Sequence, residues 1–273
     1  MNVWVNGRRS RTIDCRDRGL QYGDGLFETM RIRRHAVRLL DLHLQRLLEG
    51  CARLRIDVPD EQGLRRELEQ AASLRASGVL KLIVTRGVGP RGYRPAGGER
   101  CTRILMLSPL PGAAARGLAK PIIVRLCRMK LGTNEQLAGL KTLNRLECVI
   151  ARSEWTDKRI AEGLMRDGDD HIVCGTMSNL FLRQGTHLVT PLLDRCGVAG
   201  VMRRWVLEQA RALRLKPTVR RVGLQDLRSA EEVFMTNAIA GVMGAAEIRH
   251  GAVRIRPPMS MLAAQLRSML EAL

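Results

Sequence analysis

The stretch Leu137-Ala-Gly-Leu-Lys141-Thr-Leu-Asn144-Arg145-Leu-Glu147 places a lysine after an uncharged approach, where a helix is expected to begin. Most lysines are solvated surface charges, because an ammonium group prefers water. A partly desolvated amine has a lowered pKa and can attack a carbonyl carbon. These residues alone leave both interpretations of Lys141 open, so the rest of the chain has to decide between them.

The segments before this stretch predict alternating strands and helices. Apolar residues within 40–54 recur at spacings of three and four, which predicts a helix with one apolar stripe, and a second helix is expected over 61–74. Strands are expected at 3–5, 26–32, 36–39, 79–85 and 103–107.

The segments after position 120 predict a second set of elements. Helices are expected over 144–155, 200–213 and 259–270. Strands are expected near 121–126, 163–165, 172–173, 179–182, 187–190, 218–222, 233–237 and 241–248. The fold class is therefore α+β, with mixed sheets and helices in two layers.

The segment Ser108-Pro-Leu-Pro-Gly-Ala-Ala-Ala-Arg-Gly117 is rich in proline, glycine and alanine and lacks periodicity. Such composition is typical of an interdomain linker. We expect an N-terminal α/β domain at 1–107, a linker at 108–118 and a C-terminal domain at 119–273.

The loop Gly87-Val-Gly89-Pro-Arg-Gly92 matches the GxGxxG pattern and follows a predicted strand. A dinucleotide-binding fold needs a helix to open at that point, and Pro90 and Pro95 prevent one. We therefore interpret this loop as a flexible cover that carries Arg91 and Tyr93.

Composition excludes several classes of protein. The formal charge is +19, but basic residues are spread along the chain and aromatics are only 3%, so a base-stacking nucleic-acid surface is not indicated. No apolar run approaches the roughly 18 residues of a membrane span, and no signal-peptide pattern is present. Seven scattered cysteines and five dispersed histidines predict neither a disulfide framework nor a metal site. We expect a cytoplasmic protein that binds neither nucleic acid nor membranes.

Anion-binding groups recur in the sequence. Arg46 lies beside the apolar stripe of the first helix, and glycines at 197 and 200 precede another helix, whose first amides belong to Val201 and Met202. Arginine forks and the amides of helix N-termini are the groups that bind phosphate. Each of these signals is weak by itself.

Six segments together resemble the fold type IV family of pyridoxal-phosphate (PLP) enzymes, over residues from about 1 to 250. They are the YGDGLFET strand (Tyr22–Thr29), the HLQRL helix (His43–Leu47), the Lys141 segment, the GTMSNLF strand (Gly175–Phe181), the glycine turn (Gly197–Arg203) and the TNA segment (Thr236–Ala238). The resemblance implies a two-domain fold like that of D-amino-acid and branched-chain aminotransferases, with pyridoxal 5'-phosphate in the C-terminal domain, and a homodimer.

The resemblance also implies roles for individual residues. Lys141 would bind the cofactor covalently and act as the general base, and Arg46 would bind its phosphate. Four backbone amides would complete the phosphate cradle, those of Val201, Met202, Asn237 and Ala238.

The Lys141 segment and the Arg91-Gly-Tyr93 loop resemble, more specifically, the aminodeoxychorismate lyase branch of that family. This implies elimination of pyruvate from a dianionic ring amine, which forms 4-aminobenzoate for folate synthesis. A small anionic substrate favours cations and hydroxyls at the pocket, and the candidates are Thr29, Arg31, Arg91 and Tyr93. An aminotransferase acting on D- or branched-chain amino acids is the first alternative, and a basic nucleic-acid-binding protein is the second.

The sequence departs from the family at Cys174. The family usually has a glutamate directly before the Gly-Thr of this strand, where it pairs with the pyridine N–H. A thiol stabilises a pyridinium less well than a carboxylate does. We hypothesise that Cys174 weakens transamination and leaves elimination intact; in the alternative, Cys174 only fills space and Asp169 or Asp170 supplies the charge.

Overall fold

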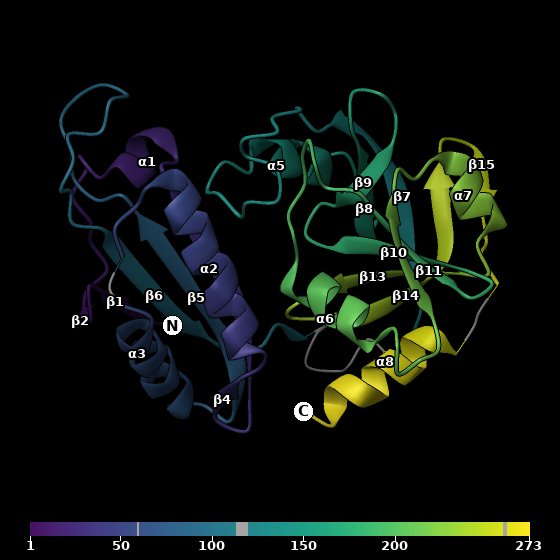
Figure 1. Ribbon diagram of the computed structural model, residues 1–273, viewed down its shortest axis with the longest axis horizontal. Helices are drawn as coiled ribbons and strands as arrows, with labels where there is room; N and C mark the ends of the chain where they lie inside the picture. The colour runs from purple at the N-terminus through teal and green to yellow at the C-terminus, as the bar shows by residue number, and fades with distance from the viewer. Residues whose placement is uncertain (59, 113–119, 259–260) are drawn as a thin grey trace. The chain divides into compact units, whose positions relative to one another are not determined.

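The computed structural model describes residues 1–58, 60–112, 120–258 and 261–273 (Figure 1). The chain forms two compact units. The first comprises Met1–Ala115 and Lys141–Asn144, and the second comprises Arg116–Leu140 and Arg145–Leu273. The fold is α+β, as the sequence predicts.

The first unit contains one six-stranded sheet. In spatial order its strands are β2 (Arg8–Arg9), β1 (Asn2–Val5), β6 (Thr102–Ser108), β5 (Ser77–Thr85), β3 (Gly25–Arg33) and β4 (Ala36–Val37). All of its pairings are antiparallel. The prediction of mixed sheets is therefore correct for the second unit only. In the first unit each strand runs antiparallel to the strands beside it.

Helices cover one face of this sheet. Along β3 the residues Leu26, Glu28, Met30 and Ile32 are buried, and those between them are half-buried. The helix α2 (Leu40–Leu54) packs on β3, and α3 (Glu61–Ser73) packs on β4 and β5 (Figure 1). Both helices match the predicted ranges, because a strong apolar stripe identifies a helix that covers a sheet.

One short helix of the first unit was not expected. In α1 (Arg18–Tyr22) the side chain of Asp17 accepts a hydrogen bond from the Gly19 amide, and the helix ends at Gly23 with φ of 68°. Glycine adopts this left-handed conformation without strain. The helix is too short to show a period, so the sequence indicated only a turn here.

The second unit contains a mixed sheet. In spatial order its strands are β12 (Lys216–Arg220), β11 (His187–Pro191), β10 (Asn179–Gln184), β13 (Glu232–Asn237), β14 (Gly241–His250), β7 (Ile122–Lys130), β8 (Ile160–Arg166) and β9 (Ile172–Gly175), while β15 (Val253–Ile255) pairs with β14. Its parallel pairs are β11 with β12, β14 with β7, and β7 with β8.

Four helices of the described part of the chain pack on this sheet. They are α5 (Leu146–Arg152) on β7 and β8, α6 (Val201–Gln209) on β13, α7 (Leu224–Ser229) on β10, and α8 (Leu262–Glu271) on β14. The sequence predicted α5, α6 and α8 with longer ranges and missed α7 and β15, which are too short for a periodic pattern. Position 259, where the last predicted helix begins, lies outside the described residues.

The Lys141 segment belongs to the first unit, although the sequence placed it in the C-terminal domain. The chain leaves the second unit at Leu140 and returns at Arg145. Backbone pairing with β3 holds the four residues between them. Most of the predicted linker, from 113 to 118, lies outside the described residues. Among the helices that are described, none has the length and apolarity needed to cross a membrane.

Candidate active site

The backbone of Lys141 pairs with the first residues of β3. The Phe27 amide donates to the Lys141 carbonyl over 3.0 Å, and the Leu143 amide donates to the Gly25 carbonyl over 3.0 Å. The Lys141 Nζ lies 4.2 Å from the centroid of the Phe27 ring. The side chain is half-buried. Its ammonium group therefore contacts an aromatic face, as expected of a partly desolvated amine.

Arg46 forms a buried ion pair on the other side of the sheet. Its Nε donates to Glu28 Oε1 over 2.7 Å, and its Nη2 lies 2.5 Å from Glu28 Oε2. His43 Nδ1 contacts the same carboxylate at 2.6 Å. Glu28 and His43 are buried almost completely. Glu28 thus orients the His43 and Arg46 side chains of the predicted HLQRL motif.

The charges of this cluster follow from its surroundings. Burial would raise the pKa of the Glu28 carboxyl, but the nearby Arg46 and His43 outweigh it and lower that pKa to about 2. Burial lowers the pKa of His43, and Arg46 adds to the effect against the opposing pull of Glu28. The cluster is therefore a carboxylate paired with a guanidinium and a neutral imidazole.

The opposite face of the sheet carries Thr29 and Arg31. We define the open face as the half-buried residues on the side away from α2 and α3: Phe27, Thr29, Arg31, Lys81, Ile83, Ile104 and Met106. An apolar hollow of about 520 Å³ lies on this face, lined in part by Ile83, Ile104 and Met106. Thr29 and Arg31 share the face with Phe27, because alternate strand residues point the same way.

The loop with Arg91 and Tyr93 is exposed but anchored at its base. The Arg18 guanidinium donates to the carbonyls of Gly92 and Tyr93 over 2.8 and 2.7 Å. The Gly92 amide donates to Tyr22 Oη over 3.1 Å. Tyr93 is 85% exposed, and its ring contacts that of Tyr22 edge to face. The loop forms no helix, which agrees with the rejection of a dinucleotide site.

Arg18 itself is fixed by Asp24, the aspartate of the YGDG turn. Asp24 Oδ2 accepts from Arg18 Nε over 2.9 Å and from Arg86 Nε over 2.8 Å. Arg86 also donates to the carbonyls of Leu54 and Arg55 at the end of α2. The turn thus ties the loop to α2, a role that the sequence did not reveal.

The second unit carries the predicted phosphate cradle. The helix α6 begins at Val201 after Gly200, and no described side chain caps this end. A Cβ at Gly200 would lie 2.0 Å from Asn179 Oδ1, so a side chain there would displace the Asn179 amide. The amides of Val201 and Met202 are therefore available to an anion at the positive end of the helix dipole.

The TNA segment lies next to β10, because Thr236 pairs with Asn179. Asn237 Oδ1 accepts from the amides of Ile239 and Ala240, which shapes the turn around Ala238. The Thr236 hydroxyl is buried, and it has no hydrogen-bond partner among the described residues. An orphaned buried hydroxyl close to uncapped helix amides fits a phosphate group well.

Cys174 lies on β9 in an apolar cluster with Val173, Met165 and Cys196. Burial raises the pKa of its thiol well above the usual value, so the thiol is neutral. Asp169 pairs with Arg195, and Asp170 pairs with Arg166 and Lys130. Both alternative carboxylates are therefore already engaged by cations.

Sequence reasoning missed Glu162, a buried carboxylate on β8. Its oxygens accept from the Gly163 amide at 2.8 Å and from the hydroxyls of Thr176 and Ser178 at 2.5 and 2.6 Å. These bonds hold the turn that follows Cys174. An acidic residue within an otherwise apolar strand was the signal that could have revealed it.

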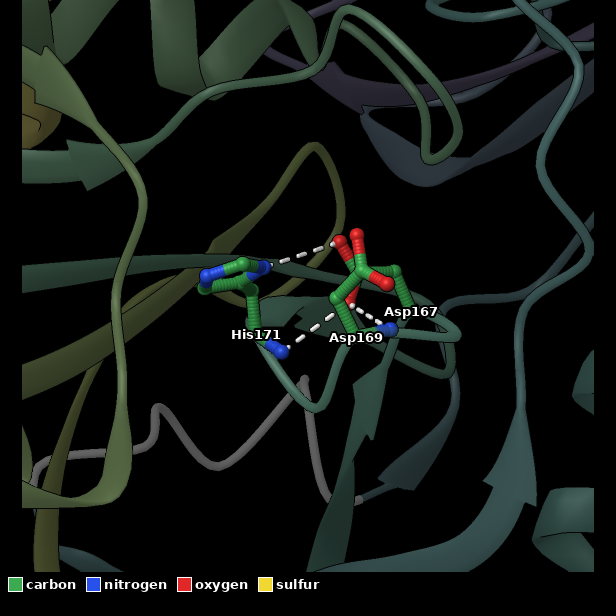
Figure 2. A group of neighbouring side chains, drawn as sticks. All are labelled: Asp167, Asp169 and His171. Carbon is green, nitrogen blue, oxygen red and sulfur yellow. Dashed lines mark hydrogen bonds and ion pairs between the residues drawn. The ribbon is translucent and has the colours of Figure 1, made fainter.

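Figure 2 shows the one cluster of potential metal ligands found among the described residues, Asp167, Asp169 and His171. Asp167 Oδ1 accepts from the amides of Asp169 and His171, which is the pattern of a tight turn. Because Arg195 already neutralises Asp169, we assign this cluster to the structure of the β8–β9 hairpin.

The predicted site residues thus divide between the two units. The first unit carries Thr29, Arg31, Arg46, Arg91, Tyr93 and Lys141, and the second carries Cys174, Val201, Met202, Asn237 and Ala238. Their roles stay predictions.

Comparison with known proteins finds relatives over nearly the whole chain. The family model for class IV amino-transferases matches residues 25–248. The crystal structure of 4-amino-4-deoxychorismate lyase from Pseudomonas aeruginosa is 43% identical to this chain, with a TM-score of 0.93 over 99% of this chain and 98% of the other.

Two curated relatives represent both activities of the family. Aminodeoxychorismate lyase of Vibrio harveyi is 31% identical over 267 residues, which are 98% of each chain. D-alanine aminotransferase of Bacillus licheniformis is 31% identical over 259 residues, which are 89% of this chain and 87% of that one. Of these two relatives, the Vibrio lyase matches over the greater share of the chain.

Proposed function

This chain belongs to the class IV aminotransferase family and is therefore a pyridoxal-phosphate enzyme of fold type IV, and we propose that it is a 4-amino-4-deoxychorismate lyase. The observation that carries the proposal is the match to the Pseudomonas lyase over nearly all of both chains at 43% identity. The reaction would release pyruvate and 4-aminobenzoate.

The residues present fit the cofactor. Lys141 offers an amine on an aromatic face, and the α6 amides with the Thr236 hydroxyl offer donors to a phosphate. We propose that Lys141 holds the aldehyde, and that Arg46, Val201, Met202, Asn237 and Ala238 serve the phosphate. When bound, the cofactor supplies a ring that accepts the electron pair of the substrate carbon.

We propose that Lys141 then works as a general base. Its amine would take the proton from the substrate carbon that bears the nitrogen. The enolpyruvyl group would leave from the adjacent carbon as the substrate ring becomes aromatic. Lys141 would return the proton to this leaving group, which becomes pyruvate. The Phe27 ring lies 4.2 Å from this Nζ and would help to orient it. Thr29, Arg31, Arg91 and Tyr93 are the proposed substrate-binding residues.

Product analysis tests this function. The purified enzyme with 4-amino-4-deoxychorismate should form 4-aminobenzoate and pyruvate in equal amounts without an added keto acid. An aminotransferase would instead form a new amino acid only when a keto acid is supplied. Because the chain is 31% identical to a D-alanine aminotransferase, the assay with an added keto acid tests the main alternative function.

Replacing Cys174 by glutamate should raise side transamination. A carboxylate here would stabilise a protonated pyridine, whereas the neutral, buried thiol does not. The measurement is the ratio of amino acid formed from an added keto acid to 4-aminobenzoate formed, which gives the partition between transamination and elimination. Cys174→Gln is the matched neutral control, and equal partition in all three proteins would contradict the idea.

We propose that the enzyme is a homodimer. On α5 the side chains of Leu146, Val149 and Ile150 are 70%, 58% and 46% exposed, at spacings that put them on one helix face. Exposed apolar clusters of this kind are typical of protein interfaces. They support a second copy of the chain as the partner.

Val149→Glu should shift the enzyme from dimer to monomer, because it buries a charge without a partner in the interface. Light scattering coupled to gel filtration measures the mass. Val219→Glu, at a 45% exposed valine of β12, is the control. A Val149→Glu protein that stays dimeric at micromolar concentration would place the interface elsewhere.

We also propose a cytoplasmic location. All seven cysteines are free thiols, and a reducing compartment maintains thiols in this state.

A further inference from the structure

Arg203 is the third residue of α6 and directly follows Val201 and Met202, whose amides are proposed to serve the cofactor phosphate. Its side chain is half-buried. Its Nε donates to Thr190 Oγ1 over 3.2 Å, and its Nη2 donates to the Pro191 carbonyl over 3.1 Å. Arg203 thus ties the first turn of α6 to the end of β11.

The end of β11 is fixed in turn to β10, the strand that shapes the cradle. Thr190 is fully buried, and its hydroxyl donates to a backbone carbonyl of β10 over 2.8 Å. Asn179, the first residue of β10, donates from its side chain to the Val198 carbonyl over 2.9 Å, in the turn that leads into α6. Asn179 also pairs with Thr236, whose buried hydroxyl lacks a partner among the described residues. Arg203 therefore belongs to the network that positions the phosphate donors.

The charge of Arg203 is not balanced by an acid. Within the described part of the chain no carboxylate forms an ion pair with it, and its hydrogen bonds go to a neutral hydroxyl and a neutral carbonyl. Burial lowers the pKa of its guanidinium, and no nearby anion opposes this effect. Arginine nevertheless stays protonated at neutral pH. The first turn of α6 thus carries an uncompensated positive charge, which favours a bound anion.

The other arginine proposed for the phosphate differs in this respect. The Arg46 guanidinium forms an ion pair with Glu28, so the two side chains together carry no net charge. A phosphate monoester carries nearly two negative charges at neutral pH. The amides of α6 supply only partial charges to such a group. Arg203 is the residue of the cradle network that offers a full charge.

We propose that Arg203 is the positioning residue of the phosphate site and the source of its net positive charge. Through Thr190 and Pro191 it holds the α6 amides in place, and its field keeps the bound phosphate in the dianionic form. It takes no part in proton transfer at Lys141. This inference rests on the proposed phosphate cradle and is independent of which amine is the substrate.

Binding of pyridoxamine 5'-phosphate to the apoenzyme tests the proposal, because this ligand cannot react with the Lys141 amine. We expect Arg203→Gln and Arg203→Met to raise its Kd by about 10- to 100-fold. Arg203→Lys keeps the charge and should bind more tightly than both. The Kd of pyridoxamine, which lacks the phosphate, should stay the same in every variant, whereas a merely structural defect would weaken both ligands.

The matched control is Arg204→Gln, at the next residue of α6. Arg204 is exposed and pairs with Glu208, so its loss should change neither Kd. Folded Arg203→Gln and Arg203→Met proteins that bind pyridoxamine 5'-phosphate within about twofold of wild type would overturn the inference. A lysine variant as weak as the methionine variant would overturn the role of the charge.

Phosphorus NMR of the wild-type holoenzyme needs no variant. A free phosphate monoester takes up a proton at about pH 6, and its resonance then shifts. We expect the bound cofactor to keep the dianion resonance from about pH 8 to about pH 5. A wild-type resonance that titrates like that of the free cofactor contradicts the proposal. A wild-type enzyme that forms no 4-aminobenzoate would instead overturn the proposed function and leave this inference standing.

Discussion

Lys141→Ala should leave a folded protein that binds no cofactor covalently and has lost its activity. The amine is the group proposed both to hold the aldehyde and to move the proton. Loss of a positioned general base alone lowers turnover by about 10²- to 10⁴-fold, and loss of covalent binding adds to this. The visible absorbance band of the purified protein and its rate of 4-aminobenzoate formation measure the two effects.

Borohydride reduction makes this prediction specific to one residue. In the wild-type enzyme, reduction should fix one cofactor to the peptide that contains Lys141, which mass spectrometry detects. Lys81→Met keeps Lys141 and should be labelled as the wild type is. If label appears on another lysine, or if Lys141→Ala keeps its band and its rate, the proposed role of Lys141 is wrong.

Glu28→Ala should be the most destabilising of the substitutions considered. It removes the ion-pair partner of the Arg46 guanidinium and the hydrogen-bond partner of the buried His43. Breaking a buried ion pair from one side lowers the free energy of unfolding by about 3–5 kcal/mol. Chemical denaturation measures the change. Glu49→Ala, at an exposed position of α2, should change it by less than about 0.5 kcal/mol.

The ion pair of Glu28 with Arg46 also predicts that the free energy of unfolding depends on pH. The pKa of Glu28 is about 2 in the folded protein, against the ordinary glutamate value of 4.5. The unfolded chain therefore binds the proton more readily between these values, and the stabilisation present above pH 4.5 is lost as the pH falls towards 2. The difference in unfolding free energy between wild type and Glu28→Ala should shrink over this window. A difference that stays constant there would mean that Glu28 is not ionised in the fold.

Local patterns predicted most of the elements. The stripe of α2 and the alternation of β3 are periodic over enough residues to identify both, and each is observed with nearly the expected bounds. Elements such as α1 and α7 are too short to show a periodic pattern, and single capping contacts set their ends. The mixed sheet expected in the first half was wrong, since strand direction depends on which distant strands pair.

Motifs also predicted the chemistry, which the family match bears out at the level of class. The resemblance of six segments to fold type IV enzymes implied an aldehyde cofactor with a phosphate, and the chain is a pyridoxal-phosphate enzyme. The partners of the motif residues were not predictable in this way. Arg46 was expected to meet a phosphate, and the structure adds Glu28 at 2.7 Å, on a strand that no local pattern connects with α2.

By itself, the sequence determined most of the helices and strands, because periodicity is a property of neighbouring residues, and its motifs carried the family resemblance that implies the cofactor. Only the tertiary structure decided that the Lys141 segment pairs with β3, and that Phe27 carries the ammonium groups of both Lys141 and Lys81. These contacts join residues far apart in the chain, and they form because backbone hydrogen bonds and buried charges must find partners wherever the fold brings them together.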